Sequence, residues 1–548
     1  MIPFSIDQNC HSLWDVIPKL QALSRHGMKA RHFVEDIDVA FAALGAHAGS
    51  GRLFLARERY YRGGGADWGA AMFYQPFLAP LSVDVQAWEP YTGMTTAALA
   101  RRLHCTVDDL YNRHSPGGAW QLIGPSYVDP RGQYHRVIGD LGLAETRDFL
   151  HQLMDQARRD MHQTFPARPC RCRIDQWFDD EDALVNDLEH RCSGGTLTDL
   201  YRLWLEEKLD GVADVGVTSS LFACGHNLHG RELLELFTTS YERAADIYNR
   251  AVHESQVGLH ALRVSEGELP LFACLEHDHR QVRVNMHLQD GQLLVGDKRC
   301  PLAAGGRLPL ESLCEMGVQA LAGKAAVLVC QVRAGEGGGP LALPHQGSLY
   351  MPAAHLLMRK LRADGLYDRP LAPVMRVRLR LLDRIGGLNQ PLHLPPHMAA
   401  AFGEDEISCR QFAQGYGPLA DEARRRLESF KTPQGRQAWT AEAMPEIGRE
   451  IEDIERRRRE LAARGAPPEE LRPLWKTMKE LQDKVLIALV EQIAVDWQVR
   501  DVGYYDSRGA MLPWAVALGG IEFYNSLLEQ AEISLENDDD PPQGEASG

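Results

Sequence analysis

The most regular pattern in this 548-residue chain is a helical hairpin, which we predict between residues 436 and 500. Apolar side chains recur near a heptad spacing, as in a coiled coil, on its second helix, at Leu471, Leu474, Met478, Leu481, Val485, Ala488 and Ile493. A shorter stripe precedes them, formed by Met444, Ile447, Ile451, Ile454 and Leu461. The second helix would be about 40 to 50 Å long at ~1.5 Å per residue. Such an arm must contact another domain, another subunit or a polymer.

Glycine and proline residues mark the ends of the two helices of the hairpin. Gly465 stands where the first helix should end, and Pro467 and Pro468 stand where the second should begin. Pro473 leaves that beginning open, because it either kinks the second helix or belongs to its first turn.

The length of the chain exceeds what one hydrophobic core can organise, so we expect three or four structural units. Changes of pattern place an N-terminal, mostly helical unit at residues 1–165 and a central α/β body at 166–435. The hairpin arm occupies 436–500, and a C-terminal helical unit occupies 501–536. Residues 537–548 are acidic, contain proline and have little to bury, which predicts a disordered tail.

Charge and cysteine usage restrict the partners and the compartment. The formal net charge of -16 argues against a nucleic-acid partner, and the basic run Arg456–Arg459 is flanked by Glu455 and Glu460, as on a solvated helix face. Eleven cysteines are scattered along the chain, and its first residues lack a signal-peptide pattern. We therefore expect a cytoplasmic, reduced protein without disulfides. No run approaches the ~20 apolar residues that a membrane span needs.

The central body combines helices with two kinds of strand pattern. Helices are predicted at 145–161, at 230–252 and along Ile521, Tyr524, Leu528, Ala531 and Leu535. An antiparallel meander is predicted from strands at 259–264, 271–275, 282–287 and 293–295, with Asp290-Gly291 as a two-residue turn. A buried strand at 325–332, a helix near 352–361 and a strand at 373–382 predict a parallel crossover. The expected fold class is therefore mixed α/β.

The loop inside this crossover is the predicted binding site. In open α/β sheets, ligands lie at the carboxyl ends of parallel strands, where a helix N-terminus offers free N–H groups to an anion. The loop residues that can line such a site are His345, Gln346, Gly347, Ser348 and Tyr350, with Ser348 a candidate helix cap. Arg376 and Arg378 share one face of the next strand and can supply positive charge.

Simpler interpretations of the same loop remain open. It can be a solvated loop before an ordinary capped helix, with the two arginines at an exposed edge or paired with carboxylates. Its spacing matches neither the P-loop nor the dinucleotide fingerprint, so no nucleotide is inferred from it and the sequence leaves the cofactor unknown.

Two cysteine–histidine groups and one helical pair are weighed against simpler structures. Cys274, His277 and His279 would place two histidines on one strand face, as in a zinc or iron site, and Cys224–His229 is similar. Neither group has a paired ligand spacing, so polar turns are favoured and no metal is predicted. Cys170-Arg171-Cys172 indicates a surface loop.

Thr95–Arg113 has the pattern of a helix-turn-helix, but Asp108 and Asp109 would repel phosphates, so a structural helical pair is favoured.

One stretch, from Leu341 to Ile385, resembles the cysteine ligases of bacillithiol synthesis. It contains PHQGSLYMPAA at 344–354 and then PVMRVRL at 373–379. In those enzymes a glycine-led helix bearing tyrosine precedes a strand with proline, apolar residues and arginine. The resemblance implies a Rossmann-like body, a dimerising helical arm and a small anionic substrate near Gly347 and Ser348. It covers under a tenth of the chain, so neither the cysteine nor the sugar–malate specificity is carried over.

Two classes of function follow from these patterns. The first is an enzyme, a ligase or transferase acting on a small anionic substrate and assembled as a homo-oligomer through its arm. The second is a non-catalytic interaction or scaffold protein whose hairpin binds a protein partner. The sequence identifies no nucleophile and no general base.

Overall fold

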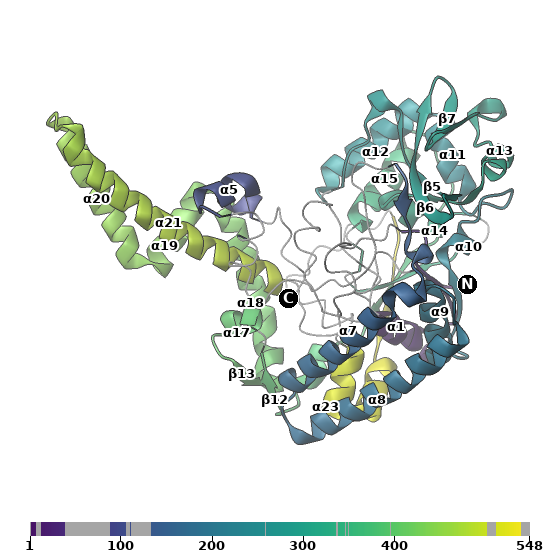
Figure 1. Cartoon of the computed structure of the whole chain (residues 1–548), viewed down its shortest axis with the longest axis horizontal. Helices are drawn as coiled ribbons and strands as arrows, with labels where there is room; N and C mark the ends of the chain where they lie inside the picture. Colours follow the sequence, from purple (N-terminus) through teal and green to yellow (C-terminus); the bar gives the residue numbers. More distant parts are fainter. Residues whose placement is uncertain are drawn as a thin grey trace.

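The mixed α/β class is confirmed by a computed structural model of the chain, shown in Figure 1. The structure describes residues 2–6, 13–38, 88–105, 110, 133–257, 259–335, 338–345, 347–348, 350–394, 396–500 and 511–538. All structural statements below concern these residues.

A six-stranded sheet organises the body. Its order is β14 (Glu532–Glu536), β11 (Val374–Arg378), β10 (Leu341–Pro344), β1 (Phe4–Ile6), β2 (Ala30–Val34) and β4 (Ala213–Val217). All neighbouring strands are parallel except β14, which pairs antiparallel with β11. Strands from 2–38 and from 532–536 thus share one sheet with the central body, and the boundaries expected at 165 and 501 do not separate them.

Helices cover both faces of this sheet because its strands are apolar on both sides. Ala342, Met375 and Val377 face one core, which contains α1 (Leu13–Arg25). That core also contains α7 (Leu143–Thr164), α8 (Arg168–Arg191), α9 (Leu197–Lys208) and α23 (Met511–Glu529). Leu341 and Leu343 face the other core, with α15 (Met351–Ala363). α11 (Arg231–Thr239), α12 (Tyr241–Ser255) and α14 (Ala326–Arg333) complete this second core.

The positions of α1 and α15 define a doubly wound sheet. The connection β1–α1–β2 runs along one face, and β10–α15–β11 runs along the other. The strand order therefore reverses between β1 and β10, as in Rossmann-type folds.

A second, antiparallel sheet packs against the α15 side. It consists of β5 (Glu268–His277), β6 (Arg280–Gln289), β7 (Gln292–Val295), β8 (Lys298–Pro301) and β9 (Val318–Gly323), with β3 (His135–Arg136) paired to β6. The predicted turn is confirmed: Asp290 and Gly291 have φ values of 50° and 73° and connect β6 to β7. The strand expected at 259–264 is wrong, because the described residues there form loop and the start of a 3-10 helix, Val264–Glu266.

Three further predictions are corrected. The strand expected at 325–332 is α14, a helix buried on nearly every side, whose continuous apolar run carries no helical period. The helix expected at 230–252 divides into α11 and α12 at Ser240. The final helix ends at Glu529, and Leu535 lies in the edge strand β14 with its side chain exposed.

The hairpin is confirmed as α20 (Pro445–Ala463) and α21 (Pro468–Val499), which project from the body in Figure 1. Gly465 has a φ of 72° in the turn, and Pro473 lies inside α21. Where the arm joins the body, α21 packs with α18 (Cys409–Phe430), α4 (Glu89–Thr92) and α5 (Thr96–Arg102). At the same place, the indole N–H of Trp88 donates to the carbonyl of Val490 at 2.9 Å. α5 is the first helix of the pair predicted at Thr95–Arg113; residues 106–109 and 111–113 lie outside the described residues.

Short elements complete the description. They are β12 (Pro391–His393), β13 (Glu406–Ser408), α10 (Thr218–Leu221), α13 (Leu310–Glu315), α16 (Leu381–Ile385), α17 (Pro396–Phe402), α19 (Pro433–Ala443) and the 3-10 turns Ile138–Asp140 and Ala304–Gly306.

Candidate functional site at the carboxyl edge of the parallel sheet

The carboxyl ends of β1 and β10 meet at the point where the strand order reverses. Ligands of doubly wound sheets bind at this point, because the loops on either side diverge and leave a crevice. The segment after β1, residues 7–12, lies outside the described residues. The segment after β10, residues 345–350, is named here the switch-point loop, and four of its five predicted site residues are described; Gln346 lies outside the described residues.

The switch-point loop turns tightly before α15. The amide of Gly347 donates to the carbonyl of Pro344 at 2.8 Å, and a Cβ on Gly347 would lie 2.7 Å from the Pro344 ring. Ser348 has a φ of 67° and is half-buried. The expectation that Ser348 caps the helix is wrong, because Tyr350 occupies the N-cap position and no side chain caps it. His345, Gly347, Ser348 and Tyr350 nevertheless lie together between the end of β10 and the start of α15.

Arg376 holds this loop from β11. Its Nη1 donates to the carbonyl of Gly347 at 2.6 Å and to that of Pro344 at 3.4 Å. Its Nε donates to Glu536 at 2.7 Å, and the residue is 7% exposed. Arg376 therefore positions the loop. Arg378 follows two residues later on the same strand and is half-buried.

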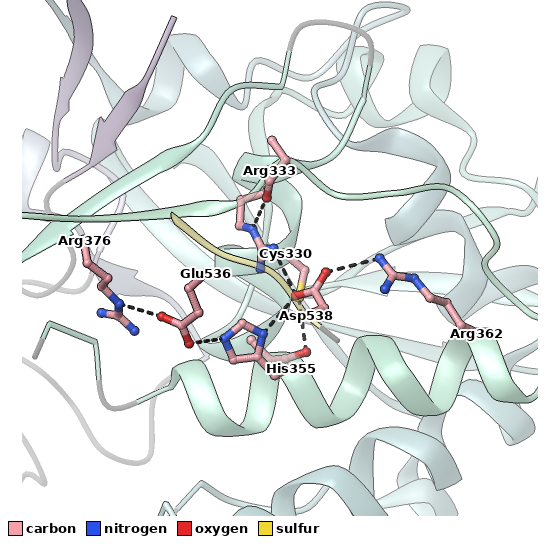
Figure 2. Close-up of polar contacts among 9 residues, drawn as sticks. Cys330, Arg333, His355, Arg362, Arg376, Glu536 and Asp538 are labelled. Carbon is pink, nitrogen blue, oxygen red and sulfur yellow. Dashed lines mark hydrogen bonds and ion pairs between the residues drawn. The ribbon is translucent and has the colours of Figure 1, made fainter. Parts of the chain in front are cut away.

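Figure 2 shows that Arg376 belongs to a larger group of buried charges, named here the β14 charge cluster. His355 of α15 bonds Glu536 through Nε2 at 2.8 Å and Asp538 through Nδ1 at 3.0 Å. Asp538 also pairs with Arg333 at 3.0 Å and with Arg362 at 3.2 Å. The disorder expected for 537–548 is wrong at Asp538, which is 3% exposed among three positive partners. Residues 539–548 lie outside the described residues.

The pKa values in the β14 charge cluster favour its charged form. Burial lowers the pKa of His355, but hydrogen bonds to Asp538 and Glu536 outweigh burial and raise it. Burial likewise opposes ionisation of Glu536, but the bond from His355 and the charge of Arg376 lower its pKa to about 2. The pKa of Asp538 is lowered against burial, through His355 and Arg333. The cluster is a paired network that ties β14 to the strand holding the switch-point loop.

Acidic and hydroxyl side chains occupy the neighbouring part of the same edge, where β2 and β4 end. Thr218 donates its hydroxyl to Asp36 at 2.6 Å or to Glu35 at 3.0 Å. The amide of Ser219 donates to Asp36 at 2.7 Å, and its hydroxyl also bonds that carboxylate. Glu35 accepts from two backbone amides, those of residues 37 and 38, each at 3.0 Å. We name Glu35, Asp36, Thr218 and Ser219 the carboxyl cluster.

Burial makes the carboxyl cluster a place where a proton can be held. Burial, followed by the charges of Asp38 and Asp36, raises the pKa of Glu35 well above its ordinary value. Burial also raises the pKa of Asp36, against the hydrogen bonds from Ser219 and Thr218. Carboxyl groups with raised pKa values are suited to general acid–base chemistry.

The sequence reasoning missed the carboxyl cluster. Its signal was the acidic run Glu35-Asp36-Ile37-Asp38 directly after an alternating segment, and the hydroxyl run at 218–220 directly after another. Both β2 and β4 have only five residues, and the Asp36–Thr218 pair is 182 residues apart. Only the adjacency of the two strands brings these runs together.

The predicted histidine groups do not form a metal site. His277 ends β5 and stacks on Tyr134 with ring centroids 3.8 Å apart, while His279 lies in the following turn with φ 61° and is fully exposed. They do not share a strand face, which corrects the arrangement expected for two ligands. His229 instead bonds the carbonyl of Val332 at 2.9 Å. Among the described residues, no group of three or more His, Cys, Asp or Glu is arranged to hold a metal.

A cavity of about 520 Å³ lies elsewhere, at the root of the arm. Trp439 and Val495 contribute to its apolar wall, and Arg426 and Asp496 to its polar side. Burial raises the pKa of Asp496 to about 7, although Arg426 lies 3.2 Å away. Its lining residues come from α17, α18, α19 and α21, so it is separate from the carboxyl edge.

The structure is a doubly wound α/β protein with a candidate site where the strand order reverses and a long helical arm. Comparison with protein-family models gave no match, and comparison with curated proteins gave none either. In the described ranges, no helix combines the length and apolar character needed to cross a membrane.

Proposed function

We propose that the chain is a cytoplasmic enzyme, a ligase or transferase, that binds a small anionic substrate at the switch-point loop. One observation carries this proposal: His345, Gly347, Ser348 and Tyr350 lie where β10 ends, at the reversal of strand order, and directly before the N-terminus of α15. The positive end of a helix dipole favours an anion at such a place.

The surrounding residues divide into three roles in this proposal. Ser348 and His345 supply hydrogen bonds to the substrate. Arg376 positions the loop through the Gly347 carbonyl, and Arg378 supplies positive charge from the same strand. Glu35, on the same sheet edge, carries the proton that group transfer requires, because its pKa is raised by burial.

The resemblance to the bacillithiol-synthesis cysteine ligases supports the same proposal. The chain has a doubly wound body followed by a long helical hairpin, the order of parts that the resemblance implies. The residues that carry the resemblance include the switch-point loop and β11. We extend from it only a small anionic substrate, since the specificity residues have no counterpart here.

We further propose that the arm assembles the protein as a homo-oligomer. α20 has no buried residue, and its apolar stripe residues Ile447, Ile451 and Ile454 are only half-buried against α21. Trp475 on α21 is 48% exposed. A second hairpin laid along this stripe would cover these side chains. The same surface favours a second function, a scaffold whose arm binds a different protein.

A thermal-shift panel tests the enzyme proposal. Small carboxylates and phosphates are compared at matched ionic strength, since a ligand present at 100 times its Kd stabilises the native state by about 2.7 kcal/mol. The double variant His345→Ala/Ser348→Ala should lose the shift. His279→Ala, which changes a fully exposed histidine in a turn, should keep it. A panel without any shift, or equal shifts in both variants, would contradict the proposal.

A further inference from the structure

Two cysteines from different segments of the chain, Cys224 and Cys314, are in contact outside the proposed substrate site. Cys224 follows α10, and Cys314 lies in α13, 90 residues further along the chain. The thiol of Cys314 donates to the carbonyl oxygen of Cys224 at 3.5 Å. Burial raises the pKa of the Cys224 thiol, and the neighbouring Cys314 raises it further.

The backbone around both thiols keeps them together. The amide of Cys224 donates to the carbonyl of Gln319 in β9 at 2.8 Å, which fixes the turn onto that strand. α13 ends three residues before β9, so Cys314 is tied to the same strand through the chain. The imidazole of His226 and the carboxylate of Glu311 lie 3.6 Å apart between the same two segments. A bond between the sulfurs would therefore require little movement of the backbone.

Exposure distinguishes this pair from the thiols of Cys170 and Cys409. Cys314 is exposed and Cys224 half-buried, whereas Cys170 and Cys409, whose pKa values burial raises, are both buried. Thiol oxidation needs access for the oxidant and a second thiol within reach. Cys224 and Cys314 meet both conditions.

We propose that Cys224 and Cys314 are a redox modification site that closes reversibly to a disulfide with a small-molecule disulfide, such as oxidised glutathione, as oxidant. The exposed Cys314 thiolate attacks one sulfur of the oxidant, forming a mixed disulfide and releasing one glutathione thiolate. Cys224, deprotonated by solvent, then attacks Cys314 Sγ and releases the second glutathione thiolate. In total, two protein thiols are oxidised and one glutathione disulfide is reduced to two thiols. This pair is the exception to the expectation that the chain forms no disulfide.

The disulfide would act on the carboxyl edge through a short segment. α10 begins at Thr218, whose hydroxyl bonds Asp36 and Glu35, and Cys224 lies six residues later. Joining Cys224 to α13 restrains residues 218–224 at both ends. Oxidation therefore stiffens the hydroxyl side of the carboxyl cluster, and reduction releases it.

Oxidation of the full-length chain tests this site. The reduced protein is incubated with oxidised glutathione at neutral pH, then measured by intact mass and by peptide mapping without reduction. We expect a Cys224–Cys314 cross-linked peptide, a mass lower by two hydrogen atoms, and no retained glutathione on either residue. Amide exchange across residues 218–224 should slow in the oxidised chain and recover after reduction.

Variants separate the two steps. Cys224→Ser should leave a persistent glutathione adduct on Cys314, because the second step is lost, while the exposed-site control Cys172→Ser should cross-link like the unmodified chain. Glutathione adducts on both residues without a cross-link, or no reaction at either, would overturn the site. Each of these two outcomes is measured on the unmodified chain, so the test holds even if a variant fails to fold. Unchanged exchange at 218–224 after cross-linking would overturn the link to the carboxyl cluster.

Discussion

Replacing Asp538 by Asn should loosen the C-terminal strand from the sheet. The Asp538 side chain is 2% exposed, and that of its partner Arg333 is fully buried. Removing one member of a buried ion pair costs about 3–5 kcal/mol, because the remaining charge stays buried without compensation. Arg333 would keep its 2.6 Å bond to the carbonyl of Ala372 but lose its carboxylate. The opening of β14 should therefore become easier by roughly two to nearly four orders of magnitude, at ~1.4 kcal/mol per factor of ten.

Amide hydrogen exchange at β14 and β11 measures this opening directly, since each strand's amides are protected by the other. Glu532→Gln is the matched control. Glu532 lies in the same strand and pairs with Arg380 at 2.8 Å, but their side chains are 53% and 42% exposed. Such a surface pair contributes at most about 1 kcal/mol, or less than roughly tenfold in exchange. If amide exchange accelerates equally in Asp538→Asn and Glu532→Gln, the reasoning that burial increases the contribution of the β14 charge cluster to stability is refuted.

Three further outcomes are expected. Exchange protection of β14 should be greatest between about pH 4.5 and 6.5. Protection should decline below that range as Glu536 and Asp538, whose folded pKa values are lowered, take up protons. It should decline above that range as His355, whose folded pKa is raised, loses its proton. Protection that rises steadily to high pH would contradict this. Trp475→Glu, at a side chain that is 48% exposed in the single chain, should dissociate the assembly by burying charge in the arm interface; light scattering that finds the unmodified protein monomeric at micromolar concentration would refute it. Protein purified without added metal should contain no zinc by elemental analysis; one tightly bound equivalent would overturn this and direct attention first to His277 and His279.

Local patterns predicted those elements whose stability is local. The hairpin follows from its apolar period with Gly465 between the helices, and the β6–β7 turn follows from Asp290-Gly291. The helix α15 and the strand β11 were also predictable, because Pro352 stands at a helix start and residues 373–379 form an apolar run. The crossover is confirmed, but its first strand is β10, while the preceding run at 325–332 is a helix.

The remaining features depend on contacts between distant residues. β1 has three residues, too few for a period to be visible, yet it is central to the sheet. Nothing near Asp538 in the sequence indicates its pairing with Arg333 and His355, which are supplied by α14 and α15. The switch-point loop could be proposed from the sequence as an anion site because its candidate residues lie in one continuous segment. The carboxyl cluster could not be proposed from the sequence, because Glu35 and Asp36 meet Thr218 and Ser219 only when β2 and β4 pair.

The position at which an anion binds is the most direct test of the proposal that the switch-point loop is the substrate site. The anion giving the largest thermal shift should be added to the full-length chain, and hydrogen exchange should be compared with and without it. The account predicts slower exchange at residues 341–354, covering the end of β10, the switch-point loop and the first turn of α15, with no change in the distal arm at residues 451–478. Protection confined to the arm, or to the cavity lined by Trp439 and Asp496, would contradict it.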